Sequence, residues 1–316
     1  MKRRIFLIIG LLLFFYIVYE AGFETIYESI RSITPAEFLI LLLLSFFSWI
    51  LHTLKWYTIL VTYGIKISFV DLFFARLGGF AIGYLTPTAF LGGIPIRAIM
   101  TPCPNKRKCA ASIIIDKAVY FSSTAFLIAV AAIIALPMAP LSEEAKIFFI
   151  LLSIVAILFS LFLFIRQKKG LLTGVLNWLK ATGIRIDFLD KNRKKIEEID
   201  FYVSDFYRNN KKRSLVVFVL NCISHLYFAG EIFVVLLFLG VGQATFLDSF
   251  FIIVFGTAVT VVPIPATLGV AETTNVIIFV LLGLGASIGV AVTIIRRVID
   301  LLWTAAGLLI ISERGF

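Results

Sequence analysis

The chain has 316 residues, of which 60% are hydrophobic and 15% charged, and its mean hydropathy is +1.03. This composition excludes a soluble enzyme, because spans of about 20 apolar residues occupy nearly the whole length. The formal net charge of +10 is concentrated in a few basic clusters. We therefore expect an all-α polytopic membrane protein with one membrane domain over residues 1–316.

The apolar stretches predict six full transmembrane helices and two interrupted segments. We interpret the interrupted segments as re-entrant hairpins over 67–101 and 245–285, which makes eight spans by a coarser count. The first helix is interpreted as retained, because no small-residue cleavage motif follows it. The full helices are expected near 5–22, 36–62, 109–136, 145–165, 214–240 and 286–311.

Lys and Arg residues predict the orientation, since cytoplasmic loops retain positive charge. The chain begins Met-Lys-Arg-Arg, and segment 166–213 holds 13 Lys and Arg against 6 Asp and Glu. We therefore expect both termini on the cytoplasmic side of the cell membrane, with hairpins 67–101 and 245–285 entering from opposite faces. We expect a first helix and outer loop over 1–35 and a first repeat half over 36–136. An extra helix and a basic amphipathic connection follow over 137–213, and an inverted second repeat half over 214–312.

Glycine and proline interrupt the apolar sequence over 77–101 and 255–273. In a bilayer, interrupted backbone is tolerated only where it is buried in protein or lines a wet cavity, since each unsatisfied group costs several kcal/mol. Paired interruptions in two halves of a chain indicate a transporter's substrate site. The competing interpretation is that small residues only allow helices to pack closely.

Polar residues inside the spans follow helical spacing and predict one polar face per helix. Simpler interpretations exist: Arg296 and Asp300 can pair along one helix, Lys55 can reach the interface by snorkelling, and histidines are commonly satisfied within bundles. We rank the charges nearest the broken backbone highest, namely Arg97, Glu272, Arg296 and Arg297. Candidates for coupling or gating are Glu231, His52, His225 and Asp300.

Four motifs occur in order: PTAFLGGIPIRA over 87–98, Asp116-Lys117, VPIPATLGVAE over 262–272, and an Arg-bearing helix over 293–307. They resemble the transmembrane domain of lysylphosphatidylglycerol synthase, a flippase-like family. Three of these motifs depart from the family pattern. Ile94 replaces an acidic residue, Asp-Lys stands for Glu-Arg, and Ala266-Thr267 replaces Gly-Gly. The aminoacyl-transferase domain is absent from this sequence, so the resemblance implies the flippase half alone.

The resemblance implies that the chain moves a phosphate-bearing lipid between leaflets, either a phospholipid or a polyprenyl-phosphate-linked glycan, by alternating access. Its membrane-lipid substrate needs a cation-lined path, in which guanidinium groups bind phosphate. We expect no cofactor, metal or catalytic residue. The expected substrate-binding residues are Arg97, Gly92, Gly93, Pro87, Lys55, Asp116, Lys117, Pro265, Gly269, Glu272, Arg296 and Arg297.

Other functions stay open. An ion- or proton-coupled small-solute transporter fits inverted hairpins equally well. A non-transporting partner of a glycosyltransferase or lipid synthase would dock through 166–213, which we also expect to adhere to anionic inner-leaflet lipids. A membrane-embedded transferase is disfavoured because the sequence contains no HExxH, GxSxG or P-loop motif. Nucleic-acid binding is not expected, since no recognition motif accompanies the charge.

Overall fold

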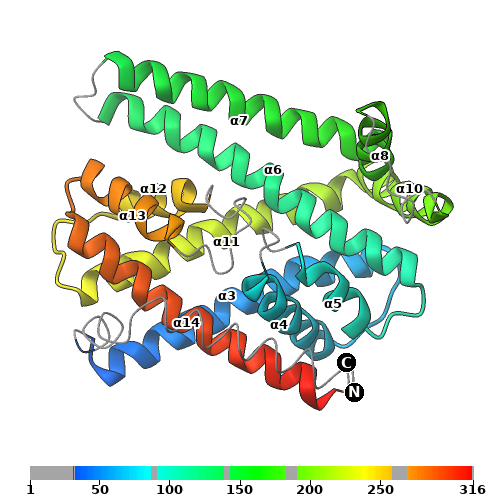
Figure 1. Ribbon diagram of the computed structural model, residues 1–316, viewed down its shortest axis with the longest axis horizontal. Coiled ribbons are helices and arrows are strands. Elements are labelled where there is room, and N and C mark those ends of the chain that lie inside the picture. The colour runs from blue at the N-terminus through cyan, green and yellow to red at the C-terminus, as the bar shows by residue number, and fades with distance from the viewer. Residues whose placement is uncertain are drawn as a thin grey trace. The chain divides into compact units, whose positions relative to one another are not determined.

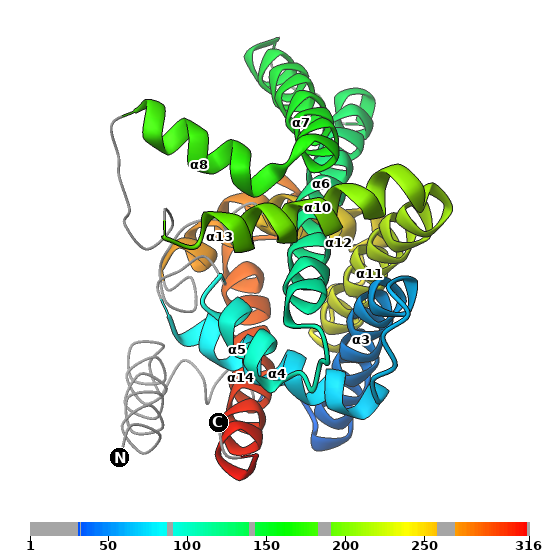
Figure 2. The same ribbon diagram turned by 90° about the vertical axis from the view of Figure 1, so that its right-hand side faces the viewer.

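The computed structural model describes residues 31, 33–86, 91–138, 143–182, 191–257 and 269–314. Helices joined by turns make up these residues, with no strand among them (Figures 1 and 2). The predicted first helix over 5–22 lies outside the described residues. The prediction of an all-α chain is confirmed.

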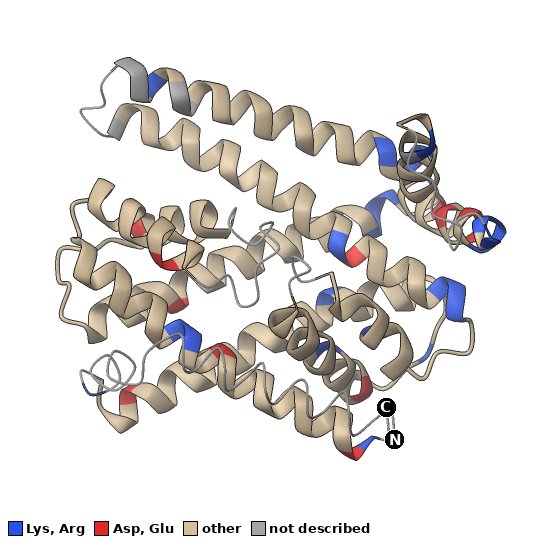
Figure 3. Cartoon of the chain, viewed as in Figure 1, with Lys and Arg blue, Asp and Glu red and all other residues tan. Residues whose placement is uncertain are grey.

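Five of the six predicted full helices fall in the described part of the chain. They are α3 (Pro35–Thr62), α6 (Lys106–Met138), α7 (Glu143–Lys169), α11 (Lys211–Phe238) and α14 (Ala286–Glu313). By length and composition, α3, α6, α7 and α11 can each cross a membrane. Helix α14 is equally long but has charged residues in its middle (Figure 3). The chain is thus a polytopic membrane protein. Among its long helices in the described ranges, α14 is the one whose hydropathy does not identify it as a membrane span.

Each predicted hairpin appears as two short helices. The first consists of α4 (Phe69–Leu85) and α5 (Gly93–Met100), and the second of α12 (Phe246–Thr257) and α13 (Val270–Leu281). At 1.5 Å per residue, the 12-residue helices α12 and α13 are about 18 Å long, too short for a hydrocarbon core of about 30 Å. The interruption predicted from glycine and proline over 255–273 therefore falls between two helices that are each too short to span the membrane.

Local sequence explains two of these helix ends. Helix α4 ends at Leu85. The next residue, Thr86, has an extended backbone and precedes Pro87, which disfavours a helical residue before it. Helix α13 begins after Gly269, whose φ of 75° lies in the left-handed region that glycine adopts without steric cost. The residues that interrupt the apolar pattern are thus also helix boundaries.

The chain divides into two compact units. Unit 1 comprises Met1–Thr53, Ser68–Pro102 and Ser224–Phe316, and unit 2 comprises Leu54–Ile67 and Cys103–Ile223. Both hairpins and α14 belong to unit 1. The predicted repeat halves 36–136 and 214–312 each contribute to both units, and their inverted relationship stays a prediction.

Close backbone contacts hold the helices of unit 1. A β-carbon at Gly93 would collide with the carbonyl oxygen of Gly79, so α4 and α5 approach at a distance that only glycine permits. A β-carbon at Gly307 on α14 would likewise lie 2.8 Å from the side chain of Ala81 on α4. Small residues at helix contacts are the usual means of close packing in membranes. This interpretation of the small residues and the transport interpretation both fit the first hairpin.

Unit 2 is built on the antiparallel neighbours α6 and α7 (Figure 1). Segment 166–213 forms α8 (Leu171–Ala181) and α10 (Arg193–Asn209). Helix α10 packs on α6 through Val203 and Phe206 (Figure 2). The carboxylate of Asp200 on α10 accepts hydrogen bonds from the backbone N–H groups of Leu172 and Thr173, at 2.9 and 2.6 Å, which caps α8.

Candidate functional site

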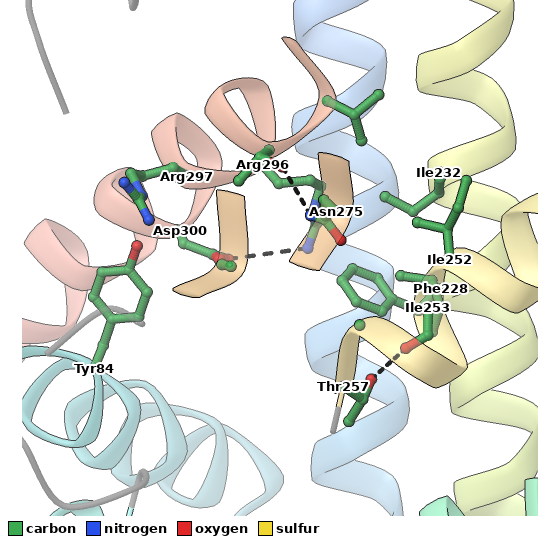
Figure 4. Close-up of a pocket in the computed structure, with 14 residues that line it drawn as sticks. Tyr84, Phe228, Ile232, Ile252, Ile253, Thr257, Asn275, Arg296, Arg297 and Asp300 are labelled. Atoms are coloured by element: carbon green, nitrogen blue, oxygen red, sulfur yellow. Dashed lines mark hydrogen bonds and ion pairs between the residues drawn. The ribbon is translucent and has the colours of Figure 1, made fainter. Parts of the chain in front are cut away.

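A cavity of about 180 Å³ lies within unit 1 (Figure 4). Residues of α4, α11, α12, α13 and α14 line it, so the first hairpin, the second hairpin and two long helices all contribute. Its wall is mixed: Ile232, Ile252 and Ile253 are apolar, whereas Arg296, Arg297 and Asp300 of α14 carry charge. The charged residues in the middle of α14 therefore line a cavity.

Arg296 is tied to helix α11. Its Nη1 atom lies 2.6 Å from Oε2 of Glu231, a residue that is 2% exposed. Asp300, one turn along α14, is farther from Arg296 at 3.9 Å, and the guanidinium also lies 4.2 Å from the ring centroid of Phe228. The (i, i+4) pair expected from the sequence is therefore present but secondary, and the principal partner comes from 65 residues away.

Arg297 is tied to the second hairpin. It forms an ion pair with Glu272, which lies in the first turn of α13, directly after the turn at Gly269. Tyr84 of α4 points toward Arg297 (Figure 4). The guanidinium of Arg297 thus lies where α4, α13 and α14 converge.

A polar contact fixes α13 against α14 beside these charges. Asn275 donates to the hydroxyl of Thr293 at 2.8 Å, and that hydroxyl donates to the carbonyl of Gly289 at 2.7 Å. A β-carbon at Gly289 would lie 3.1 Å from the side chain of Phe279, so the two helices are close at this level. Hydrogen bonding and close packing together hold the ion pair of the hairpin in register with α14.

The pairing explains how α14 tolerates its charges. An unpaired charge in a low-dielectric interior costs several kcal/mol, whereas a paired and hydrogen-bonded one is tolerated. Glu231 and Glu272 each retain one buried carboxylate oxygen with no hydrogen-bond partner among the described residues. The cluster therefore has two spare carboxylate acceptors as well as two guanidinium groups.

The predicted residues of the first hairpin lie apart from the lining of this cavity. Arg97 on α5 is buried, and its aliphatic stem packs against Gly79. Gly92 precedes α5 and Gly93 is its first residue. Pro87, and Pro265 of the second hairpin, lie outside the described residues.

Lys55 and Asp116 form a separate site within unit 2. Their side chains are 3.0 Å apart and almost fully buried, and Lys55 also donates to Asn221 at 2.6 Å. Asn221 in turn bonds to Ser123. The interpretation of Lys55 as a snorkelling residue is wrong, because Lys55 is 1% exposed and a carboxylate and an amide satisfy its ammonium inside the protein. Lys117 instead lies near the ring of Tyr120, at 5.7 Å.

Of the four candidates for coupling or gating, two are associated with the cavity and two are not. Asp300 lines the cavity and Glu231 supports it through Arg296, whereas His52 and His225 are absent from the lining. Sequence reasoning did not select Asn275 or Tyr84. Asn275 lies three residues after Glu272, so helical spacing places it on the same face and offered a signal. Across the described residues, no group of three His, Cys, Asp or Glu side chains is placed to hold a metal ion.

Comparison with known proteins gives two kinds of match. The profile of the family described as "Lysylphosphatidylglycerol synthase TM region" matches residues 4–307. A UPF0104 membrane protein of Methanothermobacter thermautotrophicus is 24% identical over 313 residues, covering 95% of this chain and 91% of the relative. A UPF0104 membrane protein of Pyrococcus horikoshii is 24% identical over 340 residues, covering 99% and 98%. No solved structure shows a significant match.

Proposed function

Because this chain belongs to the lysylphosphatidylglycerol synthase TM region family, we propose that it moves a phosphate-bearing lipid between the two leaflets of the membrane. The observation that carries the proposal is the charge cluster in the middle of α14. Arg296 and Arg297 border one cavity, and each pairs with a carboxylate from a different helix. Two guanidinium groups at one cavity suit a phosphate, because each guanidinium is planar and presents its N–H donors in a fork that matches phosphate oxygens.

The ion pairs suggest how such a site would work. A phosphate entering the cavity competes with Glu272 for Arg297 and with Glu231 for Arg296. A displaced carboxylate must then meet a positive group of the headgroup or take up a proton, because an uncompensated buried charge is costly. The Arg297–Glu272 pair is the better candidate for opening, since Glu272 belongs to a short hairpin helix rather than to a full span. Alternating access then corresponds to movement of the hairpin against α14.

Reconstitution tests this directly. The purified chain would be placed in vesicles containing a fluorescent phospholipid, and a membrane-impermeant quencher would report how much of the label reaches the outer leaflet. We expect Arg297→Ala to slow lipid movement at least about tenfold, equivalent to losing one charge-assisted contact. Arg314→Ala is the matched control, because Arg314 also belongs to unit 1 but pairs with Asp71 at a more exposed position, 2.8 Å away.

Equal rates for the wild type and Arg297→Ala would remove the cavity from the transport path. Mass spectrometry of co-purifying lipids would identify the headgroup: enrichment of one phosphate-bearing lipid in the wild type, lost in an Arg97→Ala, Glu272→Gln variant, is the expected result. Protein-free rates of lipid movement, together with no enriched lipid, would favour the small-solute carrier or the docking partner.

A further inference from the structure

A second cavity lies within unit 2 and plays no part in the transport proposal. Its volume is about 370 Å³, and its lining residues come from α6, α7, α10 and α11. The basic ends of α7 and α11 meet here, since Lys168 and Lys211 both contribute to the lining. The cavity is thus located where the positive-inside rule predicts the cytoplasmic membrane surface.

One wall of this cavity is polar and buried. Gln167 is 1% exposed, and its amide donates to the hydroxyl of Ser122 at 3.3 Å. Tyr207 is 3% exposed, and its hydroxyl is buried without a hydrogen-bond partner in the described part of the chain. Burial raises the pKa of Tyr207, so the hydroxyl stays protonated and can donate a hydrogen bond. A buried donor without an acceptor is rare in proteins and indicates a missing partner.

Lys168 and Lys211 supply the positive charge of this cavity. Neither Lys168 nor Lys211 takes part in an ion pair within the ranges that the structure describes. The ammonium of Lys168 lies 3.9 Å from the ring centroid of Phe164, which also lines the cavity. This contact holds the charge at the boundary between the polar and apolar walls.

The other wall is apolar. Leu161, Phe164 and Leu215 line it, and their exposed fractions are 52%, 45% and 63%. Leu161 and Phe164 belong to α7, a helix apolar enough to cross a membrane, so these side chains are placed to meet acyl chains. A ligand that fills the cavity must therefore be amphiphilic.

We propose that this cavity binds one anionic phospholipid, with the phosphate between Lys168 and Lys211, the Tyr207 hydroxyl donating to a headgroup oxygen, and an acyl chain along Leu161 and Leu215. The apolar wall argues against soluble phosphate as the ligand, because phosphate would leave the apolar half of the cavity unfilled. The buried Gln167 and Tyr207 argue against diffuse attraction, which needs only surface lysines. The bound lipid would connect the basic segment 166–213 to the membrane at a defined point.

Native mass spectrometry of the full chain in mild detergent tests the site. The probes are phosphatidylglycerol, phosphatidylcholine and glycerol phosphate, each titrated separately. The test variant is Lys168→Gln, Lys211→Gln. The matched control is Lys169→Gln, Lys212→Gln, which removes the same charge from neighbouring positions of the same helices that do not line this cavity. Tyr207→Phe removes only the hydroxyl and keeps the packing, so it covers the case in which the double variant fails to fold.

We expect one tightly held phosphatidylglycerol per chain, bound at least about fivefold more weakly by the cavity double variant and severalfold more weakly by Tyr207→Phe, while the control double variant matches the wild type. Three results would overturn the proposal. Glycerol phosphate that binds as tightly as the lipid would make the ligand a soluble phosphate. Equal loss in the test and control variants would reduce the effect to surface charge. Unchanged binding in both Tyr207→Phe and the cavity variant would place the lipid elsewhere.

Discussion

The buried pair of Lys55 and Asp116 offers the sharpest test of the energetics in unit 2. Across 3.0 Å, with an effective dielectric constant of about 20, the attraction between the two charges is about 5.5 kcal/mol. Desolvation of both groups offsets much of this attraction, so the pair as a whole adds little net stability. Removal of one member, however, leaves the other charge buried and unpaired.

We therefore expect Lys55→Met and Asp116→Asn each to lower the free energy of unfolding by about 3–5 kcal/mol. The double variant should cost much less than the sum, with a coupling energy of about 2–3 kcal/mol, because it leaves no orphaned charge. The assay is equilibrium unfolding in mixed micelles of rising SDS fraction, followed by helical circular dichroism.

The exposed pair Arg107–Glu198 is the matched control within the same unit. Its side chains are 45% and 39% exposed at a separation of 2.8 Å, so Arg107→Met should cost only about 0.2–1 kcal/mol. If Lys55→Met costs no more than this control, or if the two single effects simply add in the double variant, the argument from burial is refuted.

Three further outcomes are expected. Arg97→Ala should abolish lipid movement in vesicles while the protein stays monodisperse, whereas unchanged movement would remove Arg97 from the path. Gly93→Ala should destabilise the first hairpin by about 1–3 kcal/mol, because its β-carbon meets the backbone of α4; Gly242→Ala, which has open space around it, is the control. The pKa of Cys103 is lowered to about 7, chiefly by a hydrogen bond with the Cys109 thiol. The rate of Cys103 alkylation by iodoacetamide should therefore rise with pH around that value, and Cys109→Ala should move the midpoint of this pH profile to higher pH.

The sequence predicts the helices well because their signals are local. Apolar runs of about 20 residues specify α3, α6, α7 and α11, since the bilayer dictates their length. Glycine and proline specify where the hairpins stop, because these residues set backbone angles directly. Both signals can be seen within a single segment without knowledge of its neighbours.

The ion-pair and hydrogen-bond partners of a side chain are not determined locally, so the sequence predicts them less well. Helical spacing placed Arg296 beside Asp300, but the shorter contact is to Glu231 on another helix. Hydropathy allowed Lys55 to snorkel, but the helices around it supply Asp116 and Asn221. Which side chains meet depends on how each helix is rotated about its axis against its neighbours, and the periodicity of one helix does not determine that rotation.

The two adjacent arginines of α14 illustrate what this rotation achieves. Consecutive residues of an α-helix point about 100° apart, so neighbouring side chains must face different elements. Arg296 faces the long helix α11, and Arg297 faces the hairpin helix α13. A movement of α13 alone would break the pair at Arg297 and leave the pair at Arg296 intact. The two positions are therefore not equivalent: Arg296 anchors α14 to the long helix α11, whereas in the proposed mechanism Arg297 is the cation that a moving hairpin would release to a headgroup.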